Sequence, residues 1–347
     1  MRLLRAVCAL WVCGFLLHAG PAAATTGQQL AESAGRPLVG TRAPRLVLTT
    51  IDGQTIDLGR LYGHRAVYLK FWATWCVPCR QQMPHFEHVY ETAGDDLAVI
   101  AIDVGFNDSL QAIRDYRERL GIKMPIVMDD GRAGAAFHLR VTPQHIVIGR
   151  DGRIEYVGHL ADARLDAALA AARAAPAGPV APAGPVEAAA AAATPVRYQA
   201  GDSLPTLSAV TLDGQRFDLR AAGDSRRTVL VFLSPWCESY LATSRPEAAA
   251  NCRRMREQVS TLSAEEAGVR WLGIASGLWA TRQDLRAYRD KYAIRIPLTL
   301  DASGVLFRSF GVTQVPEALI ADADGRILKS VAGGELESPS AMRAAIE

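Results

Sequence analysis

An internal repeat constrains this chain more than any other sequence feature. Segments 44–76 and 205–237 share an initial proline, an Asp-Gly-Gln turn, an Asp-Leu pair and a final Trp-Cys, each displaced by 161 positions. A later group of matches, which ends in Asp-Gly-Arg-Ile, is displaced by 173 positions, so the second copy holds 12 additional residues. The chain of 347 residues is also too long for one ordinary core. It therefore contains two copies of one folding module.

The N-terminus has the layout of an export signal. Arg2 and Arg5 precede an apolar run over 6–17, and small residues follow at 21–24. This pattern predicts a signal peptide over residues 1–24 that is cleaved on export to the periplasm or another extracytoplasmic space. The apolar run is short for a membrane span, so an uncleaved anchor is the weaker alternative.

Composition limits the partners of the exported chain. The formal net charge is only +2, and no long basic or acidic block interrupts the sequence. We therefore expect no nucleic acid as a partner.

A Pro/Ala-rich stretch separates the two copies. We predict a first domain over 38–173, a flexible linker over 174–197 and a second domain over 198–347. Such a linker is typically an extended, solvated spacer, so it would tether the two domains without requiring them to dock.

Within the first copy, strand and helix patterns alternate and a hairpin follows. We predict an N-terminal hairpin, further strands and three helices; the strands are 46–50, 55–58, 66–72, 97–104, 126–128, 144–149 and 153–158, and the helices are 77–92, 109–120 and 160–174. Asp108 is the expected N-cap of the second helix. The predicted fold class is α/β, with a mixed central sheet flanked by helices in each copy.

The sequence Cys76-Val-Pro-Cys79 carries the chemistry. It follows a predicted buried strand and opens a helix, where unpaired backbone N–H groups stabilise a thiolate. Cys76 is the expected exposed nucleophile, and Cys79, one turn later, is the expected resolving thiol.

Two other interpretations of this motif are weaker. A zinc site would need a second pair of ligands, and His85 and His88 lie beyond the motif, so we expect no metal or cofactor. A purely structural disulfide would close a ring of only four residues and stabilise little.

Residues 72–80, Trp-Ala-Thr-Trp-Cys-Val-Pro-Cys-Arg, closely resemble the active site of the TlpA/ResA-like thioredoxin family. The resemblance covers about 38–173. It implies a thioredoxin-like fold and a protein that reduces disulfides in extracytoplasmic clients, as in cytochrome c or oxidase maturation. A membrane-embedded electron donor is expected to return electrons to the cysteine pair of this protein. It also implies that Thr142-Pro143 is the cis-proline segment that binds an extended client.

One position departs from this family. Many members have an acidic residue, implicated in proton transfer, where this chain has Gln82. Either Gln82 is an ordinary solvated helix residue, or the proton of Cys79 is handled by water or by another group.

The second copy keeps Cys237 but has Tyr240 in place of the nearby partner, while the offset of 173 aligns Cys79 with Cys252. On one continuous helix the two cysteines would be about 22 Å apart, too far for a disulfide. Pro246 interrupts that helix, with Ser244 as the expected N-cap of a new one. We favour a Cys237–Cys252 disulfide beside a second cis-proline at Pro316; two separate thiols are the alternative.

The leading hypothesis is a thiol–disulfide oxidoreductase whose second domain is a redox relay, or a module that binds clients or docks partners. A peroxiredoxin-like thiol peroxidase is the second hypothesis, although both copies lack the Pro-x-x-x-Thr-x-x-Cys arrangement of that class. A non-catalytic binding protein is the third, and the intact Cys-x-x-Cys argues against it.

Overall fold

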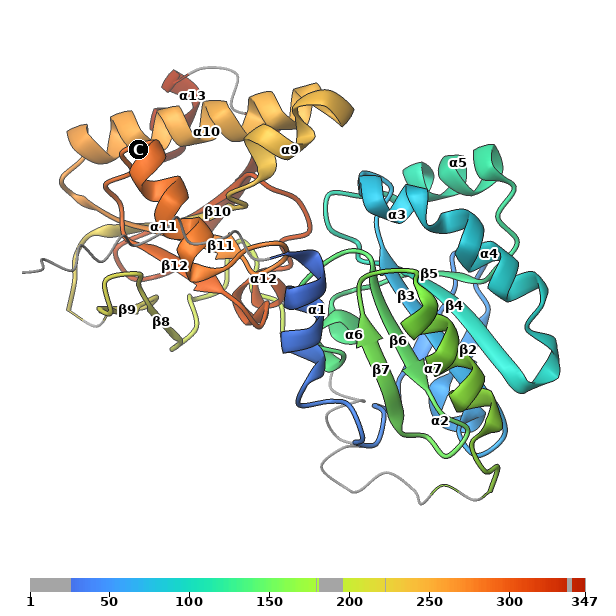
Figure 1. The fold of residues 1–347 in the computed structure, drawn as a ribbon. Coiled ribbons are helices and arrows are strands. Elements are labelled where there is room, and N and C mark those ends of the chain that lie inside the picture. The colour runs from blue at the N-terminus through green and yellow to red at the C-terminus, as the bar shows by residue number, and fades with distance from the viewer. Residues whose placement is uncertain (1–25, 179, 181–195, 222, 336–338, 347) are drawn as a thin grey trace, which may run out of the picture.

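A computed structural model describes residues 26–178, 180, 196–221, 223–335 and 339–346. The predicted signal segment and most of the predicted linker lie outside these residues. Figure 1 shows two lobes, each built from a sheet covered by helices. Within the described ranges, no helix combines the length and the apolar character needed to cross a membrane.

The first lobe contains a five-stranded mixed sheet in the order β5-β4-β3-β6-β7. Strands β3, β4 and β5 are parallel, and β6 and β7 are antiparallel to their neighbours. The strands are β1 (Val47–Thr49), β2 (Thr55–Asp57), β3 (Ala66–Trp72), β4 (Leu97–Asp103), β5 (Ile126–Met128), β6 (Gln144–Ile148) and β7 (Ile154–Gly158). The helices are α1 (Gly27–Gly35), α2 (Leu58–Leu61), α3 (Val77–Gln81), α4 (Met83–Glu91), α5 (Leu110–Leu120), α6 (Arg132–Ala136) and α7 (Ala163–Ala174), with a 3-10 turn at Gly94–Asp96.

The second lobe repeats this plan, with the sheet order β12-β11-β10-β13-β14. Its strands are β8 (Ser208–Val210), β9 (Arg216–Asp218), β10 (Arg227–Leu233), β11 (Val269–Ser276), β12 (Leu298–Asp301), β13 (Glu317–Ala321) and β14 (Ile327–Ala332). Its helices are α9 (Cys237–Ser244), α10 (Pro246–Glu265), α11 (Arg282–Lys291), α12 (Val305–Ser309) and α13 (Pro339–Ile346), with a 3-10 turn at Gly333–Glu335.

The strand pairing in the two sheets follows the same two offsets as the sequence repeat. Lys70 pairs with His145 across β3 and β6, and Val231 pairs with Ala318 across β10 and β13. These pairs are related by 161 positions on the first strand and by 173 on the second. The predicted α/β class with two repeated mixed sheets is confirmed.

The predicted helix over 77–92 is in fact two helices, α3 and α4, which meet at Gln82. Pro84 lies in the first turn of α4. Because proline has no N–H to donate to the preceding turn, and its ring clashes with that turn, it can start a helix but cannot continue one.

Two predicted N-caps are wrong. Ser109 caps α5 by accepting a hydrogen bond from the Ala112 N–H, because the Asp108 carboxylate is bound elsewhere. Arg245, not Ser244, precedes α10, and α9 continues through Ser244.

Helix α1 was not predicted. Its N-terminus is a capping box, in which the Thr26 hydroxyl accepts from the Gln29 N–H and the Gln29 side chain accepts from the Thr26 N–H. The spacing Thr-x-x-Gln was the available signal in the sequence.

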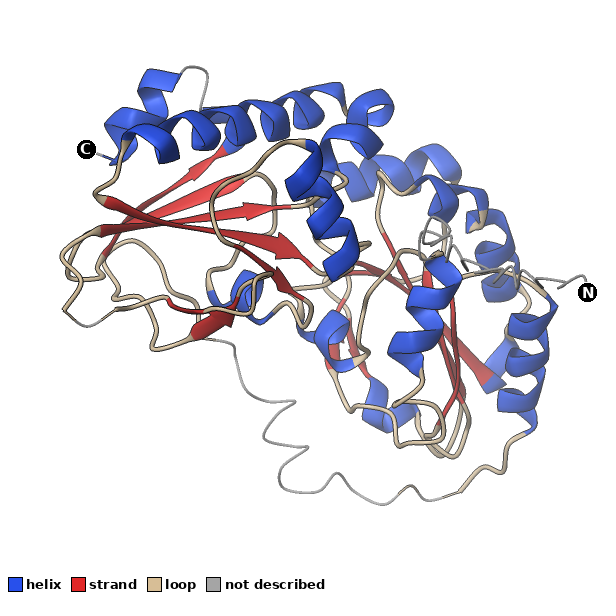
Figure 2. Ribbon diagram, turned by 60° about the vertical axis from the view of Figure 1, so that its left-hand side comes forward, coloured by secondary structure: helices blue, strands red, loops and turns tan. Residues whose placement is uncertain are grey.

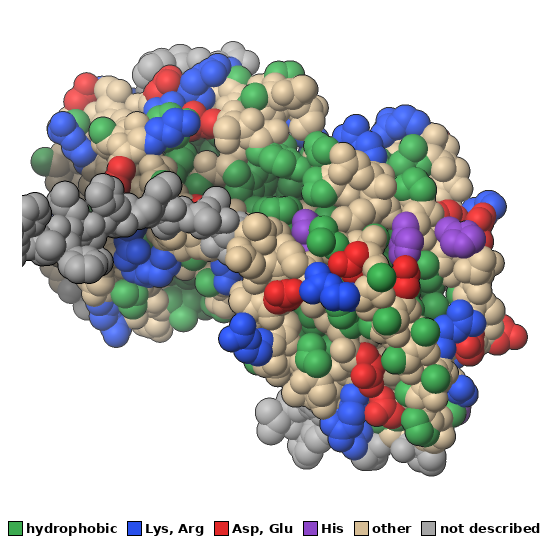
Figure 3. Space-filling model, viewed as in Figure 1, with side chains coloured by type: hydrophobic (Ala, Val, Ile, Leu, Met, Phe, Trp, Pro, Cys, Tyr) green, Lys and Arg blue, Asp and Glu red, His purple; other side chains and the backbone are tan. Residues whose placement is uncertain are grey.

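The two lobes are docked, although the linker alone did not require it. Figures 1 and 2 show them side by side, with α1 lying at the seam in Figure 1. Apolar side chains gather along part of that seam in Figure 3, and one core cluster contains buried residues from both lobes. The contacts that join the lobes include several beside the cysteine pair Cys76 and Cys79.

Candidate redox site

Cys76 and Cys79 form a disulfide where β3 leads into α3, with their Cα atoms 5.2 Å apart. Cys76 occupies the N-cap position of α3, and its sulfur accepts a hydrogen bond of 3.1 Å from the Cys79 N–H. Pro78 lies in the first helical turn, where a missing N–H leaves no partner unsatisfied. The helix start therefore presents the backbone N–H of Cys79 to the sulfur of Cys76.

The proposed client-binding segment reaches the same edge of the sheet. The Thr142–Pro143 peptide bond is cis and directly precedes β6. Gln144 of β6 pairs with Phe71 near the end of β3, from which the Cys76 loop departs. The structure thus brings the cysteine pair and the cis-proline together.

The second lobe covers this edge. Cys76 is only 1% exposed, so the prediction that it is exposed is wrong for this conformation. The Tyr240 hydroxyl accepts a 3.0 Å hydrogen bond from the Val77 N–H, and the Trp236 ring stacks on Trp75 with 5.1 Å between ring centroids. Tyr240, which replaces the second cysteine in its own copy, thus lies on the residue that follows Cys76.

A pair of equivalent backbone hydrogen bonds joins the two cis-proline segments to the opposite lobe. The Trp279 N–H donates to the Arg140 carbonyl, and the Asn107 N–H donates to the Thr313 carbonyl. Both donors have positive φ, and each acceptor lies three residues before a cis-proline. The lobes therefore dock face to face in a nearly symmetric manner.

Further contacts hold the Thr142 segment. The Trp279 indole N–H donates to the Thr142 hydroxyl at 3.1 Å, and the Arg140 guanidinium donates to the Gly277 and Ala280 carbonyls. The backbone and side chains of the second lobe thus cover the Thr142 segment that the sequence predicts to bind a client.

An ion pair closes the seam beside the cysteines. Arg245 of the second lobe lies 2.9 Å from the carboxylate of Asp108, whose side chain is fully buried. Asp108 also accepts from the Thr74 N–H at 2.7 Å and from the Thr74 hydroxyl at 2.5 Å. Because Asp108 is buried, loss of Arg245 would leave its charge without its cationic partner.

Three side chains form a hydrogen-bonded row beneath α3 and α4. The Tyr68 hydroxyl lies 2.8 Å from Nδ1 of His145, and Nε2 of His145 lies 2.8 Å from the side-chain oxygen Oε1 of Gln82. The Gln82 oxygen can only accept, so Nε2 carries the proton, and Nδ1 accepts from the Tyr68 hydroxyl. Burial holds the pKa of His145 well below 6.5, which keeps the ring neutral.

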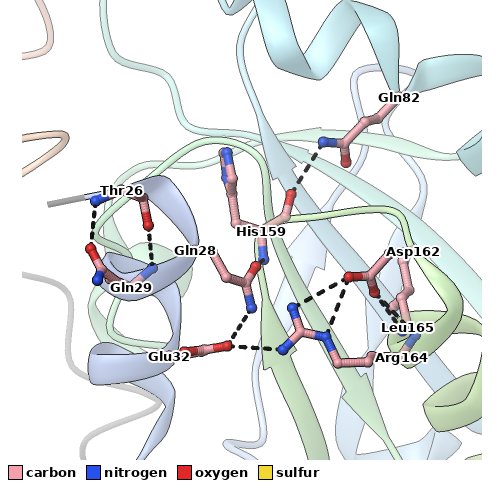
Figure 4. Close-up of polar contacts among 9 residues, drawn as sticks. All are labelled: Thr26, Gln28, Gln29, Glu32, Gln82, His159, Asp162, Arg164 and Leu165. Atoms are coloured by element: carbon pink, nitrogen blue, oxygen red, sulfur yellow. Dashed lines mark hydrogen bonds and ion pairs between the residues drawn. The ribbon is translucent and has the colours of Figure 1, made fainter.

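Gln82 is therefore not an ordinary solvated residue. Its amide donates to the His159 carbonyl at 3.2 Å, and Nδ1 of His159 donates to the Pro143 carbonyl at 2.7 Å. Figure 4 shows that the backbone N–H of His159 is bound by Gln28 of α1. This chain of contacts connects α1 and Gln82 to the cis-proline.

Figure 4 also shows the ion pair that fixes α1 against the first lobe. Glu32 of α1 binds Arg164 at 3.2 Å, and Arg164 also pairs with Asp162, the N-cap of α7. Helix α1 thus lies against the segment that follows β7.

Lys70 is a functional candidate that sequence reasoning missed. Its side chain is fully buried, with Nζ 3.5 Å from the Cys79 carbonyl oxygen and 5.1 Å from the Phe86 ring centroid. Burial lowers its pKa from 10.5 to about 7. A charged residue inside the otherwise apolar run 66–72 was the signal that could have revealed it.

The second cysteine pair is also brought together. Cys237 and Cys252 form a disulfide with a Cα separation of 6.3 Å. The chain reverses at Arg245, which lets α10 return against α9. Cys237 is fully buried, and Cys252 lines a small cavity with Pro316, whose preceding peptide bond is cis.

Among the described residues, no group of three His, Cys, Asp or Glu side chains is placed to hold a metal ion. His85 instead pairs with Asp166 at 3.0 Å.

Comparison with known proteins agrees with this geometry. Residues 39–157 match the family model described as AhpC/TSA family, and residues 199–346 match the model described as Redoxin. Thioredoxin-like protein YneN of Bacillus subtilis is 32% identical over 117 residues, which are 33% of this chain and 68% of that protein. The chain belongs to the thioredoxin-like family. It carries two thioredoxin-like domains in tandem.

Other thioredoxin-like relatives carry names that refer to disulfide chemistry. Thiol-disulfide oxidoreductase ResA of Bacillus anthracis is 30% identical over 118 residues, which are 33% of this chain and 66% of the relative. This chain thus matches slightly less than two thirds of that relative's length. A solved thiol:disulfide interchange protein of Chlorobium tepidum TLS is 29% identical and covers 38% of this chain and 96% of its own, with a TM-score of 0.35.

Proposed function

We propose that this protein is a thiol–disulfide oxidoreductase that reduces disulfides in extracytoplasmic client proteins through Cys76 and Cys79. The observation that carries the proposal is the Cys76–Cys79 disulfide at a helix start, on the same sheet edge as the cis Thr142–Pro143 bond. The names of the ResA relatives support the same chemistry.

The reaction would proceed in two exchanges. The Cys76 thiolate attacks a client disulfide, one client sulfur leaves as a thiolate, and a mixed disulfide joins Cys76 to the client. Cys79 then attacks the sulfur of Cys76 and releases the second client thiolate. The client gains two electrons, and Cys76 and Cys79 become the disulfide present in this structure.

The second domain would act as a docking module that covers the redox face until a client displaces it. Trp236, Tyr240 and Trp279 contact the residues around Cys76 and Thr142, so a client and the second lobe would compete for one surface. Exchange with a folded client would therefore require the lobes to separate.

We assign Cys237–Cys252 a structural role, in which it fixes α9 against α10. A redox relay is the alternative, and it would require this pair to cycle. The longer ring favours the structural role, because a disulfide between cysteines 15 positions apart restrains more of the unfolded chain than one between cysteines 3 positions apart.

The domain limits 38–173 and 198–347, with a linker over 174–197, remain part of this proposal, and the two family matches fall within those limits. Export by a cleaved signal over 1–24 would place the protein outside the cytoplasm. A membrane-embedded donor would then return electrons to Cys76 and Cys79.

The test is a redox titration of the mature protein, with each thiol counted by mass spectrometry after alkylation. A two-electron couple for Cys76 and Cys79 near the thioredoxin value of about −270 mV supports a reductase, whereas a value near about −120 mV indicates an oxidant. No titration of this pair would overturn the enzyme proposal in favour of a binding protein. Rapid consumption of peroxide by the reduced protein would favour a thiol peroxidase instead.

A further inference from the structure

Cys79 must lose a proton before it can attack the mixed disulfide, yet it is completely buried. Gln82, at the end of α3, has no ionisable group that could take this proton. The described residues around Cys79 must therefore supply the acceptor or admit water.

Lys70 is the ionisable group that reaches this place. It projects from the centre of β3 to the carbonyl of Cys79, beneath the first turn of α3. Its cross-strand neighbours are His145 on β6 and Ala101 on β4, and Nζ lies 5.1 Å from the ring centroid of Phe86 on α4. Within the described part of the chain, no carboxylate forms an ion pair with Lys70.

We propose that the neutral amine of Lys70 accepts the proton of the Cys79 thiol as Cys79 resolves the mixed disulfide. The S–H bond of Cys79 breaks, and an N–H bond forms on Lys70. The thiolate forms a new S–S bond with Cys76, and the electron pair of the broken bond leaves on the client sulfur. Lys70 afterwards releases the proton to the departing thiolate or to solvent.

The pKa of Lys70 suits this step. A value near 7 leaves a large fraction of the side chain neutral at neutral pH, and transfer is efficient when the acceptor's pKa lies near the working pH. The resulting ammonium, which lies close to the backbone of Cys79, would stabilise the Cys79 thiolate through its positive charge.

His145 is the other titratable group that faces Lys70, and its hydrogen bonds exclude it as the acceptor. Its Nδ1 lone pair accepts from Tyr68, and its Nε2 proton is donated to Gln82. Its pKa is also far below that of a useful base at neutral pH. His145 and the more distant Tyr68 and His159 therefore remain neutral around Lys70.

The second lobe provides an internal comparison. The positions equivalent to Lys70, His145 and Gln82 are Val231, Ala318 and Met255. Buried polar groups are costly to maintain, so an apolar interior is expected wherever no proton has to move. The lysine and its polar neighbours occur only beneath the cysteine pair that we propose to cycle.

The test compares Lys70→Met with Lys123→Met, a matched control whose lysine lies at the surface and pairs with Glu91. Each reduced protein is mixed with oxidised glutathione, quenched with acid at successive times and analysed by mass spectrometry for the mixed and the internal disulfide. The assay is run from about pH 5.5 to about pH 9, a range that spans the pKa of Lys70 and the ordinary pKa of a cysteine thiol. The role of Lys70 as proton acceptor rests on the proposed function of Cys79. The assay reports on the role of Lys70 and on the exchange activity itself.

In wild type and in the control, the rate at which the mixed disulfide is resolved should rise with pH and show an inflection near pH 7. In Lys70→Met, resolution at pH 7 should slow by about 10²-fold, and the inflection should move to about 8.5 or above, as for an unassisted thiol. The glutathione adduct should accumulate as a result. Equal resolution profiles in all three proteins would overturn the role of Lys70 alone, whereas no mixed disulfide in wild type would overturn the proposed function.

A measurement on wild type covers the case in which Lys70→Met does not fold. The NMR titration of the Lys70 side chain should give a midpoint near 7 in the oxidised protein. In the reduced protein the midpoint should lie higher, because the two groups titrate as a coupled pair. An identical midpoint in both redox states would overturn the proposal.

Discussion

The two copies share a fold but differ in what lies beneath their cysteines. In the first lobe, Lys70, His145 and Gln82 place ionisable and hydrogen-bonding groups under the Cys76–Cys79 pair. In the second lobe, the equivalent side chains are those of Val231, Ala318 and Met255. The fold that the two copies share therefore holds two different kinds of cysteine pair.

The sequence separation of the two cysteines in a pair also differs between the copies. Cys76 and Cys79 are separated by two residues at a helix start, whereas Cys237 and Cys252 are 15 positions apart and join two helices. A short ring suits exchange between neighbouring thiols, and a long ring restrains more of the unfolded chain. This difference supports our proposal that the first copy uses its disulfide for exchange and that the second copy uses its disulfide for stability.

The largest expected effect concerns exchange activity. Cys76→Ser should lower the rate of disulfide reduction in a model peptide by about 10³-fold or more, because a hydroxyl cannot replace the thiolate nucleophile. The double variant Cys237→Ala, Cys252→Ala should retain the activity of wild type. If the double variant lost activity as Cys76→Ser does while remaining folded, the second pair would be a relay.

The next effect concerns stability. The double variant Cys237→Ala, Cys252→Ala should lose about 3 kcal/mol of unfolding free energy, because its disulfide closes a ring of about 15 residues. Cys76→Ala, Cys79→Ala should lose about 2 kcal/mol or less, because its ring is shorter. Denaturant titration of the oxidised proteins measures both, and a larger loss at the first pair would contradict the division of roles.

A smaller effect should appear at the seam between the copies. Arg245→Met leaves the buried carboxylate of Asp108 without its cation, which favours separation of the lobes. The alkylation rate of reduced Cys76 should rise by about tenfold, the equivalent of about 1.4 kcal/mol. Arg226→Met is the control, because it breaks an ion pair with Asp224 at a distance from the cysteines. Equal rates in all proteins would show that the Arg245 pair does not hold the seam closed.

The smallest effect tests the polar interior of the first copy. Neutral His145 has a folded-state pKa well below 6.5, so the unfolded chain binds the extra proton as pH falls through 6.5 and stability declines. His145→Gln preserves a donor and an acceptor but cannot titrate, so the loss of unfolding free energy below pH 6.5 should be shallower by up to about 1.4 kcal/mol per pH unit.

The control for this pH effect is His64→Gln, which makes the same substitution at an exposed histidine. A slope in His145→Gln as steep as in wild type would mean that the folded state already accommodates the charged ring.

Local sequence signals predicted much of the first lobe. The apolar runs marked β3 and β4, and the Cys-x-x-Cys followed β3 as expected. Helix limits were less predictable, because Pro84 divides α3 from α4 and Ser109 takes the cap expected of Asp108. Those errors arise from competition between local partners. The Asp108 carboxylate, for example, is engaged by Thr74 and Arg245, which are distant in sequence.

The sequence alone establishes the repeat, its two offsets and the residue types around each cysteine. Short-range patterning and spacing specify which module forms and where its thiols lie along the chain. The burial of Cys76 beneath Tyr240, the ion pair of Arg245 with Asp108 and the approach of Lys70 to Cys79 depend on packing. They join residues 9 to 163 positions apart, and no periodicity or spacing rule encodes such encounters. They exist because folding buries a charged side chain beneath α3 and because two similar faces dock against each other.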